Sequence, residues 1–222
     1  SQPTDVGIIA DPKVALHELA EALETGMSGS AKEAAKGRAA LLTSEKAAAR
    51  AAWKRQVKDR WDHRPMSDER MVSEIADVLP KDVTFVADSN TARPSLNQTF
   101  QFDRPDSFFT QRGGAIGWGM GGAMGLKLAQ PDRPVVAFVG DGSAMMTVQA
   151  LWTAANENIP VLYVISNNAS YRVLKVGLDM YKKQILKDES AQSQYIGMDF
   201  PNPLNIAGLA EAMGVYSRRI ED

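Results

Sequence analysis

The hydrophobic pattern of the chain's second half is dominated by buried strands. Three short apolar runs, 83–87, 134–139 and 160–166, have the length and composition of β-strands. The last two read VVAFV and VLYVI at their centres and are almost continuously apolar, as in strands covered on both faces. Helical patterns lie between and after them, including 144–156 and 204–213. This alternation predicts an α/β fold, with a parallel sheet and helices on both of its faces.

The first quarter of the chain has a different pattern. The run 6–10 (VGIIA) predicts a strand, and apolar residues at helical spacing follow it, so we expect 1–24 to be the tail of a preceding central domain. Residues 25–63 are rich in Ala, Lys and Arg and predict a helical linker. The main domain is expected over 64–222, with Ser67 capping its first helix. We expect this domain to be incomplete at its C-terminal end, and the chain to be part of a longer subunit.

Composition excludes several classes of partner. The 25 basic residues nearly balance the 27 acidic ones, so no overall field favours nucleic acid or an anionic membrane. The longest stretch of small and apolar residues, 113–126, is too short and too rich in glycine to span a bilayer, and no signal peptide is expected. The chain has no cysteine, which excludes structural disulfides and thiol catalysis. We therefore expect a cytoplasmic protein with no nucleic-acid or membrane partner.

A short polar motif ends the second predicted strand. The sequence Gly140-Asp141-Gly142-Ser143 follows it directly, and a helix begins at once. Ligands of open parallel sheets bind beyond the carboxyl ends of strands, which is where Asp141 is placed. The flanking glycines allow close approach, and the N–H groups of Gly142 and Ser143 at the helix start are suited to phosphate. An ordinary turn between strand and helix would also favour these residue types.

A second polar motif ends the next strand. The pair Asn167-Asn168 follows it, with 24 residues between Gly142 and Asn167. That length fits one helix and one strand, so a right-handed crossover would bring Asp141 and Asn168 to the same sheet edge. A carboxylate and an amide oxygen are hard ligands suited to Mg²⁺. The alternative is that Asn-Asn is a plain turn.

The two motifs together carry a family resemblance. GDGS, 24 residues and then NN resembles the diphosphate and magnesium motif of thiamine-diphosphate enzymes. The stretch ALWTAANENIP between them is similar to the benzoylformate decarboxylase branch, and the likeness runs from about residue 64 to 222. The resemblance implies thiamine diphosphate and Mg²⁺ as cofactors. It also implies that Asp141 and Asn168 give side-chain oxygens and Ser170 its main-chain carbonyl to the metal, while the N–H of Tyr171 lies within reach of the diphosphate.

The resemblance also implies contacts to the two rings of the cofactor. The segment 112–117 precedes the metal motif, where relatives grip these rings. Ile116 matches the bulky apolar wedge that forces a bent cofactor, and its β-branched side chain is stiff. Gly114 matches the position whose carbonyl faces the aminopyrimidine. In the turn after the first strand, Asn90 and Thr91 are candidates for the diphosphate, although a helix cap is an equal explanation for them.

One motif points to a different function. Residues 117–122 contain a literal G-x-G-x-x-G, and Asp141 lies 19 positions after Gly122 at a strand end. This imitates the dinucleotide-binding fingerprint of an oxidoreductase domain. The strand before it, near 107–112, is short, and this interpretation leaves GDGS and Asn167-Asn168 unexplained. We therefore interpret these glycines as packing around a cofactor ring.

The resemblance implies a reaction and an assembly. The expected activity is decarboxylation of a 2-oxo acid or carboligation, either benzoylformate decarboxylase-like or acetolactate synthase-like. The activating glutamate of the family belongs to an N-terminal pyrimidine-binding domain that we do not find here, so no catalytic residue is expected in this segment, and the segment alone is expected to be inactive. In relatives that domain comes from a partner subunit, which implies a homodimer or tetramer. A non-catalytic, regulatory half remains an alternative.

Overall fold

The computed structural model describes residues 3–111, 113–188 and 194–221 and divides into two compact units, Ser1–Ala52 and Trp53–Asp222. The first unit holds α1 (Pro12–Gly26) and the beginning of α2 (Gly29–Asp59). The carboxylate of Asp11 caps α1 by accepting the N–H groups of Lys13 and Val14. Neither helix contains a buried residue.

One expectation for this unit is wrong. No strand forms at 6–10, where Ile8 and Ile9 are largely exposed. A strand needs a partner for its backbone hydrogen bonds, and no strand in the described part of the chain lies beside this run. The helix expected within 25–63 is confirmed, because α2 covers Gly29–Asp59.

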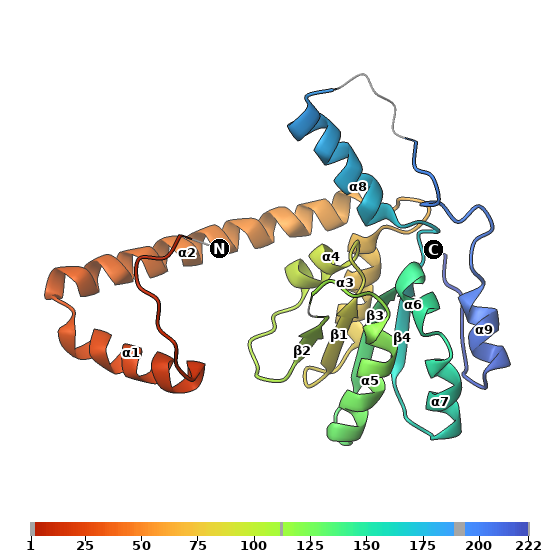
Figure 1. Cartoon of the computed structure of the whole chain (residues 1–222), viewed down its shortest axis with the longest axis horizontal. Helices are drawn as coiled ribbons and strands as arrows, with labels where there is room; N and C mark the ends of the chain where they lie inside the picture. The colour runs from red at the N-terminus through yellow and green to blue at the C-terminus, as the bar shows by residue number, and fades with distance from the viewer. Residues whose placement is uncertain (1–2, 112, 189–193, 222) are drawn as a thin grey trace. The chain divides into compact units, whose positions relative to one another are not determined.

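The second unit is built on a parallel four-stranded sheet in the order β2-β1-β3-β4 (Figure 1). The strands are β1 (Thr84–Asp88), β2 (Phe108–Thr110), β3 (Val135–Gly140) and β4 (Leu162–Ser166). The three strands expected from the sequence are therefore confirmed to within about two residues. From β1 the chain crosses to β2 on one side and then returns to form β3 on the other side of β1. The connections after β1 and β3 therefore run in opposite directions along the sheet. Such a switch point is where ligands bind in open α/β sheets.

Two apolar layers cover the sheet. On one face, the core joins Val86, Ala137 and Val139 to α5 (Trp118–Ala129), α7 (Ala150–Asn156) and α9 (Ile206–Ala212). On the other face, Phe85 and Phe138 pack against α3 (Asp68–Val78) and α4 (Arg93–Thr99). Neighbouring residues of one strand thus enter opposite cores, which explains the continuous apolar runs. The fold expected from the sequence is confirmed.

The helix expected over 144–156 is wrong in its extent. The structure has α6 (Asp141–Met146) and then α7, separated by a bend at 147–149. Helix α6 begins directly on the GDGS motif, so the polar loop is also the first turn of a helix. Thr147 ends α6, and its hydroxyl donates to the carbonyl of Gly117 at 2.6 Å. This long-range bond is available only because the helix stops there.

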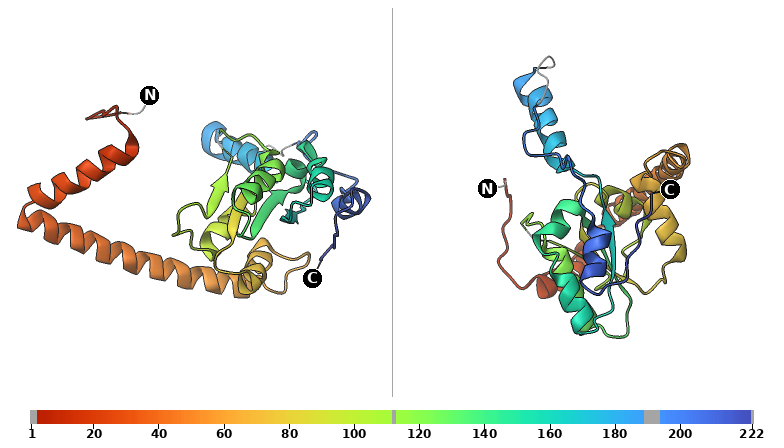
Figure 2. Two further views of the ribbon diagram at one scale, coloured as in Figure 1. Left: turned by 90° about the horizontal axis from the view of Figure 1, so that it is seen from below. Right: turned by 90° about the vertical axis from the view of Figure 1, so that its right-hand side faces the viewer.

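In the part of the chain that the structure describes, two helices and a π-helical turn follow β4. They are α8 (Arg172–Met180), the π-helical turn η1 (Tyr181–Leu186) and α9. Helix α8 contains no buried residue and extends away from the sheet (Figures 1 and 2). No helix among the described residues is long and apolar enough to cross a membrane.

Candidate functional site

The candidate residues all follow the carboxyl ends of the four strands, either in loops or, after β3, in the first turn of α6. Asn90 and Thr91 come after β1, Gly114 and Ile116 after β2, and Asp141 after β3. The remaining candidates follow β4. In the sheet register Asp88 pairs with Val139 and Gly140 with Ser166, so the ends of β1, β3 and β4 lie side by side. The topology therefore brings the predicted site residues to one edge of the sheet.

Asp141 is the buried polar centre of this edge. Its side chain begins α6 and the residue is 3% exposed. Oxygen Oδ1 accepts the N–H of Gly142 at 2.9 Å, whereas Oδ2 is buried and has no hydrogen-bond partner among the described residues. Burial raises the pKa of the carboxyl, and the N–H groups of Gly142, Ala169 and Ser170 oppose that rise. A buried oxygen without a partner is costly, which makes it a natural ligand position for a cation.

The loop after β4 lies against Asp141 and is tied to the loop after β1. The side-chain oxygen of Asn168 accepts the N–H of Ser170 at 3.0 Å. Its amide nitrogen donates to the hydroxyl of Thr91 at 3.2 Å. Ala169 lies between Asn168 and Ser170 with a φ of 53°, in the left-handed region that non-glycine residues seldom occupy. Asn168 therefore joins two predicted cofactor contacts, Thr91 and Ser170.

Tyr171 has a different place from the one expected. Its N–H donates to the carbonyl of Met198 at 2.8 Å, so it is not free for a phosphate in this structure. Instead, its ring covers Gly142, where an added Cβ would lie 2.5 Å from a ring carbon. The ring meets that of Phe200 edge to face, with 4.9 Å between centroids. The contact gives a structural reason for glycine in the second half of the GDG motif.

The loop after β2 begins at the same edge of the sheet as the other candidate residues. Gly114 has a φ of 77° and is exposed, and Ile116 is half-buried. Asn90 is likewise exposed and Ser143 is buried at the start of α6. Further along the chain, Met120 and Ala123 are fully buried in the core, so the stretch 113–125 is not a continuous exposed apolar surface.

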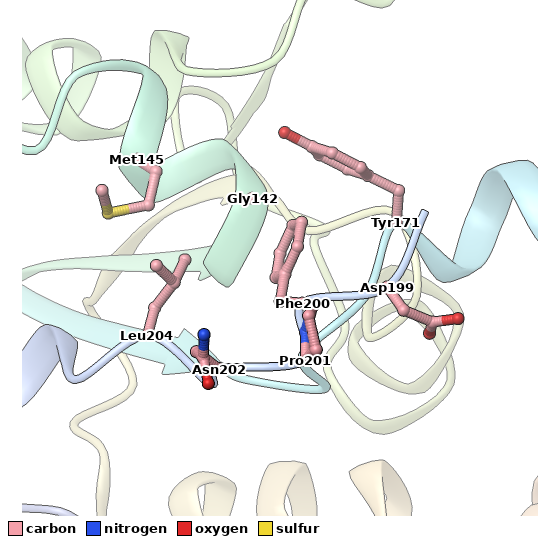
Figure 3. Close-up of a pocket in the computed structure, with 8 residues that line it drawn as sticks. All are labelled: Gly142, Met145, Tyr171, Asp199, Phe200, Pro201, Asn202 and Leu204. Atoms are coloured by element: carbon pink, nitrogen blue, oxygen red, sulfur yellow. The ribbon is translucent and has the colours of Figure 1, made fainter. Parts of the chain in front are cut away.

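A cavity of about 400 Å³ opens beside the polar edge (Figure 3). Figure 3 shows the rings of Tyr171 and Phe200 next to each other, and the carboxylate of Asp199 turned away from Met145 and Leu204. Asp199 is used elsewhere, in an ion pair with Lys175 of α8. The lining is otherwise mostly apolar, with Gly142, Met145, Tyr171, Phe200, Pro201, Asn202 and Leu204 around the cavity.

Two residues of this edge were not identified as site residues from the sequence. Asp88 is 1% exposed, and its Oδ2 accepts the N–H groups of Gly117 and Gly119, each at 2.9 Å. Thr147 holds the carbonyl of the same Gly117. The only signal for Asp88 was an acidic residue at the end of a buried strand. No sequence signal indicated Thr147, because its bond depends on where α6 ends.

The donor set fits a magnesium ion. No group of three or more His, Cys, Asp or Glu side chains suited to a metal occurs among the residues that the structure describes. The edge offers instead one carboxylate with an unpartnered oxygen, from Asp141, an amide oxygen from Asn168, and loop backbone. Mg²⁺ is bound in this way, by few protein oxygens together with phosphate oxygens and water.

Comparison with known proteins identifies this arrangement. Residues 91–222 match the family model of the thiamine pyrophosphate enzyme C-terminal TPP binding domain. The chain is 34% identical, over half of its length, to benzoylformate decarboxylase of Pseudomonas aeruginosa. It is 29% identical, over 70% of its length, to acetolactate synthase of Mycobacterium bovis.

A solved structure gives the same result. Thiamine diphosphate-dependent 4-hydroxybenzoylformate decarboxylase of Rhodococcus jostii RHA1 superposes on 72% of the chain with a TM-score of 0.64 and 26% identity. The chain spans only 21%, 25% and 28% of the lengths of these three proteins. The resemblance drawn from the GDGS and Asn-Asn motifs is confirmed. The chain belongs to the thiamine pyrophosphate enzyme family, and residues 91–222 are its C-terminal cofactor-binding domain.

Proposed function

We propose that this chain holds the diphosphate and magnesium ion of thiamine diphosphate in a 2-oxo-acid decarboxylase or carboligase of the benzoylformate decarboxylase type. The observation that carries the proposal is the buried, unpartnered Oδ2 of Asp141 at the end of β3. It lies beside the loop of Asn168 and Ser170 at the end of the neighbouring strand. A metal ion bound there would remove the cost of burying that oxygen.

The chain's own residues would divide the binding between them. Asp141, Asn168 and the carbonyl of Ser170 would hold Mg²⁺, and the N–H groups of Gly142 and Ser143 would donate to the diphosphate. Asn90 and Thr91 would reach the diphosphate from the opposite side, across the switch point. Because the N–H of Tyr171 is already paired, we assign its side chain to covering Gly142 and excluding water from the motif.

The rings of the cofactor would be oriented by the loop after β2. Ile116 would wedge between them, and the carbonyl of Gly114 would accept the amino group of the aminopyrimidine. When bound, the cofactor supplies a carbon nucleophile and then a sink for the electron pair that remains after CO₂ leaves a 2-oxo acid. We expect the glutamate that activates it to come from the pyrimidine-binding domain of a partner subunit, in a homodimer or tetramer.

The metal assignment is tested by replacing Asp141 with alanine in the full-length protein. We expect thiamine diphosphate binding that depends on Mg²⁺ in the wild type and is lost in Asp141→Ala, as measured by calorimetry. Asp132→Ala is the matched control, because Asp132 is exposed and lies at the opposite end of β3. Equal affinity in wild type and Asp141→Ala would refute the assignment.

The type of reaction needs a separate assay. The alternative is an acetolactate synthase-like transferase, which has a relative of similar identity. The full-length protein with cofactor should be offered benzoylformate and pyruvate, and the products identified by mass spectrometry. Release of the aldehyde supports a decarboxylase, whereas condensation of two pyruvate molecules supports the synthase.

The dinucleotide-binding alternative is disfavoured by the position of its motif. The glycines at 117–122 follow β2, a three-residue strand at the edge of the sheet, whereas the fingerprint follows a central strand. Their close contacts are also explained within the chain. An added Cβ at Gly119 would meet Asp88, and one at Gly122 would meet the ring of Trp118 at 2.7 Å.

A further inference from the structure

In the turn that follows Ile116, both backbone polar groups of Gly117 make hydrogen bonds to side chains. The N–H of Gly117 donates to Oδ2 of Asp88 at 2.9 Å, and its carbonyl accepts the hydroxyl of Thr147 at 2.6 Å. Asp88 also accepts the N–H of Gly119 at 2.9 Å. The turn is thus tied to the end of β1 on one side and to the end of α6 on the other.

Each anchor belongs to an element that carries another candidate contact. Asp88 ends β1 and leads into the turn of Asn90 and Thr91. Thr147 ends the short helix that begins with Asp141, so one rigid turn and a half joins it to the proposed metal ligand. The two hydrogen bonds therefore set the distance between the ring-binding loop and the metal-binding edge.

Close packing leaves this turn little freedom. Gly117 has a φ of 96°, and an added Cβ there would lie 2.5 Å from Cβ of Met146. An added Cβ at Gly119 would lie 2.5 Å from Cβ of Asp88. Each of these hydrogen bonds holds a turn with little steric freedom, so losing one would loosen the turn.

The carboxylate of Asp88 is costly where it stands. It is 1% exposed, and its Oδ1 has no hydrogen-bond partner among the described residues. Burial raises its pKa, and the N–H groups of Gly119 and Gly117 and the side chain of Ser143 oppose the rise. A buried polar group of this kind requires an explanation, and holding two backbone N–H groups of the turn provides one.

We propose that Asp88 and Thr147 are positioning residues that clamp Gly117 and so hold Gly114 and Ile116 against the rings of the cofactor. The inference rests on the proposed function. The hydroxyl of Thr147 holds the turn at the end of the ring-binding loop and is not itself assigned to the metal or the diphosphate, so its loss should affect the rings selectively. Its loss would lower the fraction of molecules whose loop is ready to bind, and the apparent affinity falls by that fraction.

The test compares two ligands and four variants of the full-length protein. Thr147→Val removes the hydroxyl at nearly constant shape, Thr147→Ala repeats the removal, and Thr147→Ser retains the hydroxyl. Thr110→Val is the matched control, because Thr110 also donates its hydroxyl to a backbone carbonyl of the sheet, that of Ala87 at 3.1 Å. Affinities for thiamine diphosphate and for inorganic pyrophosphate are measured with Mg²⁺, the second by displacement.

The two ligands separate positioning from general damage. We expect Thr147→Val and Thr147→Ala to weaken thiamine diphosphate binding roughly two- to tenfold, as for one buried hydrogen bond, with pyrophosphate binding unchanged. Thr147→Ser and Thr110→Val should bind both ligands as the wild type does. Equal weakening of both ligands, or no weakening of thiamine diphosphate, would overturn the clamp. A wild type that binds neither ligand with Mg²⁺ would instead overturn the proposed function.

Discussion

Replacing two glycines of the same helix by alanine should change the stability of the protein in opposite directions. Gly119 and Gly121 both lie in the first two turns of α5 with ordinary helical backbone. An added Cβ at Gly119 would lie 2.5 Å from Cβ and 3.1 Å from Oδ2 of Asp88. An added Cβ at Gly121 would have no described atom within 4 Å outside the adjacent backbone of its own helix. Asp88 ends a buried strand and cannot turn aside like the tip of a flexible side chain. The pair therefore isolates one steric contact.

The expected magnitudes follow from two opposing effects. Alanine is better than glycine inside a helix by about 1 kcal/mol, and both variants gain this. Gly119→Ala also overpacks a filled site, at about 1–3 kcal/mol, and disturbs two hydrogen bonds to Asp88 worth about 1 kcal/mol each. We expect a net loss of about 2–4 kcal/mol for Gly119→Ala. Gly121→Ala should gain about 0.5–1 kcal/mol.

The assay is urea and thermal unfolding of each variant beside the wild type, followed by circular dichroism. At about 2–4 °C per kcal/mol for a unit of this size, the two melting temperatures should move in opposite directions by a measurable amount. A Gly119→Ala variant that is as stable as Gly121→Ala would show that Asp88 does not pack on α5 as described.

Three further outcomes are expected. Ala169→Gly should raise the stability by about 0.5–1 kcal/mol in urea unfolding, because the left-handed backbone at φ 53° costs alanine more than glycine. Burial raises the pKa of Tyr163 from 10.0 to about 12. The stabilisation of the fold by the neutral phenol is therefore complete below pH 10 and is lost as the pH rises towards 12. Tyr163→Phe should therefore flatten the alkaline loss of stability, by about 1–2 kcal/mol after allowance for partial exposure. Sedimentation of the full-length protein with thiamine diphosphate and Mg²⁺ should show at least a two-fold dimer, and a fully active monomer would contradict the proposed assembly.

The hydrophobic pattern predicted the sheet because the residues of each strand indicate whether its two faces are buried. The runs at 134–139 and 160–166 are apolar on both faces, and such runs have few stable places other than the middle of a covered parallel sheet. The position of Asp141 followed from the same fact, since a polar motif after a buried strand must lie at the sheet's edge. These inferences use only neighbouring residues, and they hold.

The run at 6–10 shows the limit of that reasoning. VGIIA has the composition of a strand, yet a strand is stable only when another one accepts its hydrogen bonds. Sequence periodicity carries no information about whether such a partner is present. The break between α6 and α7 is similar, because 144–156 is continuously compatible with a helix, and the bond from Thr147 to Gly117 is made where the helix ends.

The use of Asp88 shows why part of the site could not be predicted at all. In the sequence Asp88 resembles any acidic residue that begins a turn. The sequence indicates the residues after it, Asn90 and Thr91, as the ligands instead. The role of Asp88 depends on Gly117 and Gly119, which lie 29 and 31 positions later and come near because the chain reaches them from β2, which pairs with β1. The glycines that imitate a dinucleotide fingerprint are explained by the same contact, since Gly119 leaves room for Asp88. The apparent dinucleotide motif is therefore explained by packing against Asp88 of the neighbouring strand. Only the topology distinguishes this explanation from dinucleotide binding.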